Sequence, residues 1–238
     1  MMREFESILI GPGALPVRTL HPHLPELAPP QPAIAAPALW KLALDKGAAA
    51  LGLLFFAPFL IGISLIILCV EGGPIFYAHE RIGQGGRPFR CLKFRTMAVN
   101  ADRLLADLLE RDPAARREWQ DTRKLARDPR ISRLGAILRR SSLDELPQFL
   151  NVLKGEMSMV GPRPVVTEEL HHYGPFLADY LSVRPGLTGL WQVSGRSDTS
   201  FEERVALDTR YVRSQSFVAD LRILCRTVWV VLRGKGAR

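Results

Sequence analysis

A stretch of 24 residues without a charged side chain, from Gly47 to Val70, constrains this chain more than any other feature of its sequence. As a helix it would be about 36 Å long, which exceeds the roughly 30 Å hydrocarbon thickness of a bilayer. The stretch therefore predicts a membrane segment. Pro58 lies near its middle, which leaves two arrangements open: a kinked helix that spans the bilayer, or a re-entrant helix that returns to the same side. Hydropathy alone favours the span, because membrane helices tolerate proline.

The charges around this segment weaken the preference for a span. Lys41 and Lys46 precede it and a basic body follows it, so a span would place positive charge on both sides of the membrane. The chain has 32 Lys and Arg residues against 24 Asp and Glu, a net charge of +8. This surplus indicates an anionic partner, which could be nucleic acid, a phosphorylated substrate or anionic lipid.

Two further features limit the class of protein. Residues 1–38 hold eight of the 18 prolines and show no helical or strand periodicity, which predicts a flexible tail. The three cysteines, Cys69, Cys91 and Cys225, are scattered and form no CxxC pair. A disulfide scaffold and a structural zinc site are therefore excluded, and a reducing compartment fits.

Beyond the membrane segment, Ile75 to Ile82 and Arg87 to Phe94 are rich in aromatic and branched residues and flank the glycine-rich stretch Gly83 to Gly86. This pattern predicts a β-hairpin. The glycines could instead cradle a phosphate, although no Lys-Ser or Lys-Thr follows them as a P-loop requires. The remaining periodicity predicts helices at Ala101 to Arg111, Ala114 to Arg127, Ile131 to Arg140 and Phe217 to Leu232. The last of these suits either a core helix or one in the membrane interface.

Adjacent carboxylates, Asp144 and Glu145, follow a basic helix and precede the apolar stretch Phe149 to Leu153. Whether the next helix is capped at Ser142 or at Asp144, the pair lies at a helix N-terminus, where the helix dipole keeps Asp144 ionised at neutral pH. An ionised carboxylate can act as a nucleophile or bind a metal ion. The competing interpretation is a helix cap without further function.

Basic side chains accompany this pair along the sequence. Arg139 precedes it, and Arg163 follows it in a loop stiffened by two prolines, which is typical of a phosphate site with a divalent ion on the carboxylates. Strand alternation places Lys93 and Arg95 on one face that could bind a diphosphate or simply face solvent. Arg184 opens a turn-rich segment that ends at Arg196 and could be either a ligand-covering loop or a packed one.

The order of these motifs resembles the bacterial sugar transferases, the monotopic polyprenyl-phosphate phosphoglycosyltransferases. The resemblance covers Lys41 to Gly236 and is closest to the short members that prime exopolysaccharide with galactose 1-phosphate. One departure is His79, in a place often held by Gln. The resemblance rests on the following motifs: the Pro-broken membrane segment, His79-Glu80-Arg81-Ile82-Gly83, Lys93-Phe94-Arg95-Thr96-Met97, Asp128-Pro129-Arg130, Ser142 to Gln148, Asn151 to Ser158, Gly161-Pro162-Arg163-Pro164 and Arg184 to Gly189.

The resemblance implies a fold, a topology and a site. The fold is α+β and mainly helical: a monotopic membrane protein with a re-entrant helix broken at Pro58, a small β-hairpin and amphipathic interfacial helices. Its parts are the tail at 1–38, the membrane helix at 39–72 and a cytoplasmic catalytic domain at 73–238, at the bacterial inner membrane. Asp144 matches the nucleophile of this family and Glu145 matches its second acid. The resemblance also implies that both residues bind the cofactor Mg²⁺. The matching or candidate substrate-binding residues are Lys93, Arg95, Arg139, Arg163 and Arg184.

The implied reaction moves a hexose 1-phosphate, with galactose 1-phosphate favoured, from a UDP-sugar to undecaprenyl phosphate and releases UMP by a ping-pong route through Asp144. Glucose 1-phosphate or another sugar phosphate is the alternative. A second alternative is a membrane-tethered scaffold or anion-binding protein that is not an enzyme. The expected partners are both substrates and membrane lipids, with a homo-oligomer left open. Nucleic acid is not expected, because the body lacks a nucleic-acid-binding module.

Overall fold

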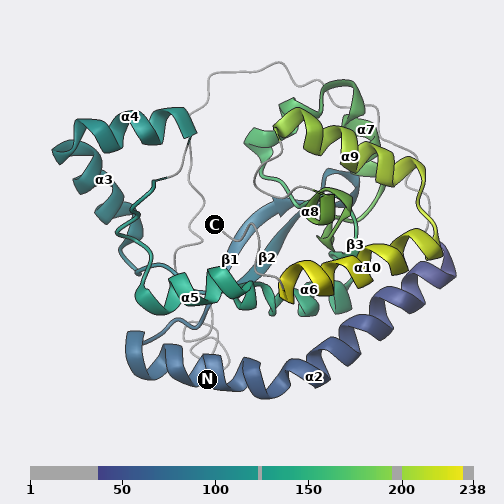
Figure 1. Cartoon of the computed structure of the whole chain (residues 1–238), viewed down its shortest axis with the longest axis horizontal. Helices are drawn as coiled ribbons and strands as arrows, with labels where there is room; N and C mark the ends of the chain where they lie inside the picture. Colours follow the sequence, from purple (N-terminus) through teal and green to yellow (C-terminus); the bar gives the residue numbers. More distant parts are fainter. Residues whose placement is uncertain (1–36, 123–124, 195–199, 233–238) are drawn as a thin grey trace.

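The computed structural model describes residues 37–122, 125–194 and 200–232, so the tail predicted over residues 1–38 lies almost wholly outside the described residues. The described chain is mostly helical with short strands (Figure 1). In chain order its elements are α2 (Leu39–Glu71), β1 (Phe76–Ile82), η2 (Gln84–Gly86), β2 (Pro88–Phe94), α3 (Ala101–Arg111), α4 (Pro113–Thr122), α5 (Arg133–Ser141), η3 (Leu143–Glu145), α6 (Gln148–Lys154), β3 (Ser158–Val160), η4 (Thr167–Phe176), α7 (Leu177–Ser182), β4 (Gly186–Thr188), α8 (Leu190–Ser194), α9 (Phe201–Arg213) and α10 (Phe217–Leu232).

Helix α2 contains the apolar stretch and is the described helix that is long and apolar enough to cross a membrane, by length and composition. It has 33 residues and runs through Pro58 without interruption, so the predicted break at this proline is a bend instead. Figure 1 shows α2 curving along one side of the molecule. The bend has a local cause, because Pro58 has no N–H to donate to the carbonyl of Leu54 and its ring crowds that carbonyl.

The predicted β-hairpin is confirmed. Strands β1 and β2 pair antiparallel with Phe76 opposite Phe94 and Ile82 opposite Pro88, and the glycine-rich stretch forms the turn between them. Asn151 of α6 fixes this hairpin to the next layer. Its side chain is fully buried, accepts a hydrogen bond from the Leu92 N–H (3.0 Å) and donates to the Arg90 carbonyl (2.7 Å). A buried amide that satisfies backbone groups in this way sets the position of α6 against the strand edge.

The main core lies between α2, the hairpin and α6. Phe149 of α6 stacks on Phe56 of α2, with ring centroids 6.1 Å apart, and its ring fills the space beside Gly52. A Cβ at Gly52 would lie 2.7 Å from the Phe149 ring, so the close approach of the two helices requires glycine there. The apolar side of α2 that faces the body is therefore bound by packing, while much of its remaining surface is exposed.

A parallel pair of short strands, β3 and β4, was not predicted. Ser158 pairs with Gly186 and Val160 with Thr188. Strands of three residues show too little alternation to be recognised in a sequence. Above this pair, η4, α7 and α9 enclose a second cluster of buried side chains, whereas α3 and α4 stand apart from it (Figure 1). The members of that cluster are Ile82, Val165, Tyr173, Tyr180, Leu181 and Val205.

The predicted bounds of the helices α3 and α10 are confirmed, and two others differ. Helix α4 ends at Thr122, so the predicted continuation to Arg127 is wrong. Helix α5 begins at Arg133 and not at Ile131, because the Ser132 side chain accepts a hydrogen bond from the Gly135 N–H (2.8 Å) and caps the helix. The apolar stripe of α10 is divided: Phe217 and Val228 are exposed, whereas Leu224 packs against the main core.

Buried charges join the start of α2 to the body. Lys41 donates to the Asp220 carboxylate of α10 (2.6 Å) and to the Val160 carbonyl (3.0 Å), and its Nζ lies 3.3 Å from Asp45. Asp45 accepts from the Ser158 hydroxyl (2.9 Å), and all four side chains are buried. A lysine placed among two carboxylates and a carbonyl is thereby paired, as burial of its charge requires.

Candidate active site

The adjacent carboxylates lie on a short turn between two helices. Helix α5 ends where Ser142 adopts a left-handed conformation (φ 58°), and the single 3₁₀ turn η3 then carries Asp144 and Glu145. Helix α6 begins only at Gln148, after Pro147. The pair therefore lies in the first turn of a short 3₁₀ helix with Ser142 as its N-cap residue, and not in the first turn of α6 itself. Pro147 has no N–H to bond the carbonyl of Leu143, so the turn remains separate from the helix that follows.

Asp144 is held in a nearly closed environment, with 7% of its surface exposed. Burial raises its pKa to about 6, and the charge of Glu145 acts in the same direction, while the charges of Lys93 and Arg139 lower it. At pH 7 the side chain is therefore mostly a carboxylate. The charges of Lys93 and Arg139 both favour this carboxylate form.

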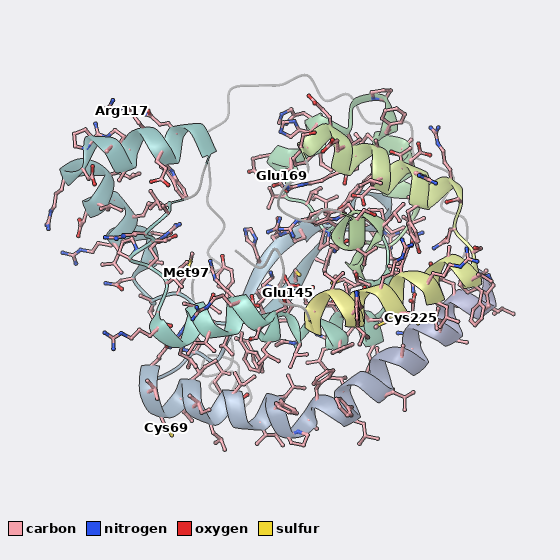
Figure 2. All side chains as sticks on the ribbon, viewed as in Figure 1. Cys69, Met97, Arg117, Glu145, Glu169 and Cys225 are labelled. Atoms are coloured by element: carbon pink, nitrogen blue, oxygen red, sulfur yellow. The ribbon has the colours of Figure 1, made fainter. Side chains whose placement is uncertain are left out.

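Lys93 connects the hairpin to the carboxylate pair. Its Nζ donates to Glu145 Oε1 at 2.6 Å, and both side chains remain partly exposed. In Figure 2, Glu145 lies near the middle of the molecule, where β2, η3 and α6 meet. Lys93, which is predicted to bind substrate, thus lies beside the carboxylate pair, with Glu145 as its direct partner.

Arg139 approaches the pair from α5. Its Nε donates to the Thr96 hydroxyl (2.9 Å), and its charge acts on Asp144. The helix reaches this position because Gly135 lies against the backbone of Thr96, where a Cβ would be only 2.1 Å from the Thr96 carbonyl oxygen. Gly135 therefore allows α5 to place Arg139 beside the site.

Arg163 comes from the loop between β3 and η4 and lines a pocket beside Glu145. Its guanidinium lies over the ring of the buried Trp191, 5.7 Å from the centroid, and Arg204 lies over the same ring at 4.9 Å. A cation on an aromatic face is restrained without losing its hydrogen-bond donors. Trp191 thus presents Arg163 to the pocket as part of a rigid assembly.

Two predicted substrate-binding residues lie elsewhere. Arg95 donates to the carbonyls of Glu71 (3.1 Å) and Gly72 (2.8 Å) at the end of α2, so it closes that helix. Arg184 lies beside Gly155 at the end of α6, next to Lys46, where cations suit the negative end of the helix dipole. The structure brings Lys93, Arg139 and Arg163 to the carboxylates and does not bring Arg95 or Arg184 there. The end of the predicted covering loop, residues 195–196, lies outside the described residues.

Three polar residues of the pocket carried no assignment in the sequence analysis: Arg81, Gln148 and Gln192. Arg81 lies in one of the quoted motifs, and alternation along the predicted hairpin from Lys93 would have identified it. The other two have no sequence signal of their own, since they reach the pocket only through the packing of α6 and α8.

A metal ion would find two carboxylates here. Among the described residues no group of three or more His, Cys, Asp or Glu side chains could hold a metal, so a complete protein cage is absent from that part of the chain. Mg²⁺ does not need one, because it is commonly bound by one or two carboxylates together with water and substrate phosphates. The adjacent oxygens of Asp144 and Glu145 fit that mode of binding.

The pocket is lined by Glu145 and by three basic side chains, Arg81, Lys93 and Arg163, a composition that suits an anionic ligand. The chain belongs to the bacterial sugar transferase family, which matches residues 36–234. It is therefore a transferase, as the sequence motifs indicate.

Several curated relatives are similar over most of the chain. The exopolysaccharide production protein ExoY of Rhizobium meliloti (strain 1021) is 49% identical over 197 residues, which are 83% of this chain and 87% of that protein. The undecaprenyl-phosphate galactose phosphotransferase of Salmonella typhimurium (strain LT2) is 50% identical over 167 residues, 70% of this chain and 35% of that protein. The UDP-glucose:undecaprenyl-phosphate glucose-1-phosphate transferase of Caulobacter vibrioides is 40% identical over 208 residues, 84% of this chain and 72% of that protein.

Proposed function

We propose that this chain transfers a hexose 1-phosphate from a UDP-sugar to undecaprenyl phosphate and releases UMP, as the first membrane step of exopolysaccharide synthesis. The observation that carries the proposal is Asp144 itself: a nearly buried, mostly ionised carboxylate with Lys93 and Arg139 around it. Two relatives are named for sugar phosphate transfer involving undecaprenyl phosphate. Helix capping alone would not account for the basic groups gathered around the turn.

The reaction takes place in two displacements at one phosphorus atom. A carboxylate oxygen of Asp144 attacks the sugar-bearing phosphorus, the bond to the bridging oxygen breaks, and its electron pair leaves with UMP. The sugar phosphate is then held on Asp144 as an acyl phosphate. A phosphate oxygen of undecaprenyl phosphate attacks the same phosphorus, which restores the carboxylate and yields the lipid diphosphate sugar. Arg139 and Arg163 bind phosphate oxygens during both steps.

We include Mg²⁺ in this proposal, bound by Asp144 and Glu145 together with the diphosphate. Bound there, the ion would neutralise phosphate charge that otherwise repels the nucleophile. Lys93 holds Glu145 in place at 2.6 Å and supplies a second positive charge at the same side of the turn.

Galactose 1-phosphate is the favoured group for transfer. The relative named for galactose is 50% identical, and the relative named for glucose is 40% identical over a longer stretch. The two sugars differ in the configuration of one hydroxyl, which a few hydrogen bonds in the pocket can distinguish.

UMP release tests the reaction. Purified full-length protein with Mg²⁺ and undecaprenyl phosphate should release UMP from UDP-galactose faster than from UDP-glucose, and Asp144→Asn should lower this release at least 1,000-fold, roughly the loss expected without a nucleophile. The matched control is Asp112→Asn, which makes the same change on an exposed residue outside the site. Release by Asp144→Asn near the wild-type rate would reject the nucleophile, and no release from any UDP-sugar would favour a scaffold protein.

We further propose that α2 is re-entrant, so that both of its ends and the catalytic body lie on the cytoplasmic face of the bacterial inner membrane. The bend at Pro58 and the basic groups on both sides of the apolar stretch support this placement.

Cysteine labelling distinguishes the two topologies. Cys69 and Cys225 are exposed and would be replaced by Ser, while Cys91 is buried and can remain (Figure 2). Leu39→Cys reports on the start of α2 and Arg111→Cys on the body. An impermeant thiol reagent should label both only after the cells are opened. Labelling of Leu39→Cys alone in intact cells would establish a span.

A further inference from the structure

One face of the hairpin forms a wall of the pocket beside Glu145. The register places Tyr77 opposite Lys93 and His79 opposite Cys91, and Arg81 follows on the same face by alternation. Arg81, Cys91 and Lys93 all line the pocket, and so does Arg163. Arg81 lies four residues along the strand from the residue opposite Lys93, so it is on the side of the pocket away from the carboxylate pair.

Arg81 has little to balance its charge. Its side chain is 16% exposed, and its nearest carboxylate is that of Glu169, 3.6 Å away and more exposed than Arg81 itself. Burial lowers the pKa of Arg81, and the charge of Arg163 lowers it further. Two guanidinium groups are therefore held close enough to repel each other. Such an arrangement is unfavourable in the empty protein and becomes favourable when an anion enters.

His79 lies on the same hairpin face as Arg81 and Lys93. It lies between Arg81 and Lys93 on the hairpin face, and its pKa is lowered to about 4, first by burial and then by the charges of these two residues. Glu168 and Glu169 act in the opposite direction without cancelling the effect. Burial, and after it the charges of Arg81 and Lys93, thus favour the neutral form of this histidine.

Resting on the proposed function, we propose that Arg81 binds the nucleoside-side phosphate of the UDP-sugar, together with Arg163. Lys93 touches the carboxylate pair, so the phosphorus that Asp144 attacks must lie at that end of the pocket. The phosphate attached to uridine then extends toward Arg81. When the bond to the bridging oxygen breaks, the new charge on UMP develops beside the guanidinium, which can donate two parallel hydrogen bonds to it.

The test is UMP binding to purified full-length protein, measured by calorimetry in the presence of Mg²⁺. Arg81→Gln should raise the Kd for UMP roughly 10- to 100-fold, the range for lost hydrogen bonds to a charged group. Arg90→Gln is the matched control, because Arg90 is exposed on the other face of the same hairpin. Glu169→Gln removes the ion-pair partner but keeps Arg81, so its Kd should equal that of the wild type or be lower.

Three results would overturn the inference. These are an Arg81→Gln Kd within twofold of the wild type, a Glu169→Gln Kd raised as much as that of Arg81→Gln, or a wild type that binds no UMP. The last result would also reject the proposed function, whereas the first two would leave it standing. If Arg81→Gln does not fold, Arg81→Lys carries the test: it keeps the charge but loses the two-pronged donor, and an unchanged Kd would overturn the inference.

Discussion

At the scale of single residues, burial decides which acids in this protein differ from their ordinary behaviour. Asp208 of α9 is 2% exposed and accepts a hydrogen bond from the Tyr173 hydroxyl at 2.9 Å. Burial raises its pKa to about 7, against the effects of that hydrogen bond and of a second one from the backbone of Arg163. Asp208 therefore helps to hold the loop that presents Arg163, at the cost of burying a charge above neutral pH.

This carboxyl predicts a dependence of stability on pH. Its pKa is higher in the folded than in the unfolded protein, so its contribution to stability is greatest near pH 4 and is lost as the pH rises to about 7. The Tm of Asp208→Asn minus the Tm of the wild type should therefore be more positive at pH 7.5 than at pH 4.5. Thermal unfolding between pH 4.5 and pH 7.5 measures this Tm difference, with Asp112→Asn at an exposed position as the control. A Tm difference that does not change with pH would contradict the assignment.

At the scale of elements, α2 depends on two kinds of contact with the body. Phe149 packs against its middle, and Lys41 joins its first turns to α10 and β3 through buried hydrogen bonds. Tyr211 of α9 completes this arrangement by donating to the other oxygen of Asp220 at 2.7 Å. Helix α2 is thus fixed by buried contacts to the rest of the described chain.

Removing the lysine should destabilise this junction strongly. Lys41→Met leaves Asp45 and Asp220 buried without their cation, which costs roughly 3–5 kcal/mol. We expect a Tm several degrees below the wild type in detergent, and partial recovery in the double variant Lys41→Met with Asp220→Leu, where one unpaired charge is also removed. Lys154→Met changes an exposed lysine and should leave the Tm unchanged. Equal Tm values for Lys41→Met and Lys154→Met would refute a stabilising junction.

How much could be predicted from the sequence also differs between elements. The hairpin, α3 and α10 follow from local pattern, and the carboxylate pair with Lys93, Arg139 and Arg163 is recognisable from residue types and motif order. The pairing of β3 with β4 joins residues that are far apart in the chain, so no local pattern indicates it. In the sequence, Arg95 and Arg184 cannot be distinguished from the arginines of the site, because all of them are basic residues within the motifs. Only the fold shows that Arg95 and Arg184 lie at helix ends.

At the scale of the whole molecule, exposed apolar side chains gather on one side. Helix α2 lies along this side, and α5, α6 and α10 lie next to it in Figure 1. The exposed side chains include Phe55 and Phe59 on α2 and Val218 and Val228 on α10. Exposed apolar side chains on neighbouring helices indicate a lipid or protein contact, and the length and apolar composition of α2 favour lipid.

Quenching by brominated lipids tests this orientation. Trp229 is exposed on α10, whereas Trp119 lies on α4, which stands away from α10 in Figure 1. In nanodiscs that contain brominated lipid, Trp229→Phe should clearly reduce the quenchable part of the tryptophan fluorescence, and Trp119→Phe should not. An equal effect of both substitutions, or none from Trp229→Phe, would place α10 outside the bilayer surface.

The junction at Lys41 has one more consequence, which concerns distance. Because the beginning of the membrane helix is bound to the strand that precedes the Arg163 loop, the pocket cannot rise or sink relative to α2 without breaking buried ion pairs. The fold therefore fixes the height of the pocket above the lipid. The enzyme should then recognise its acceptor by the level at which the phosphate emerges from the membrane, and the length of the hydrocarbon below that level should matter little.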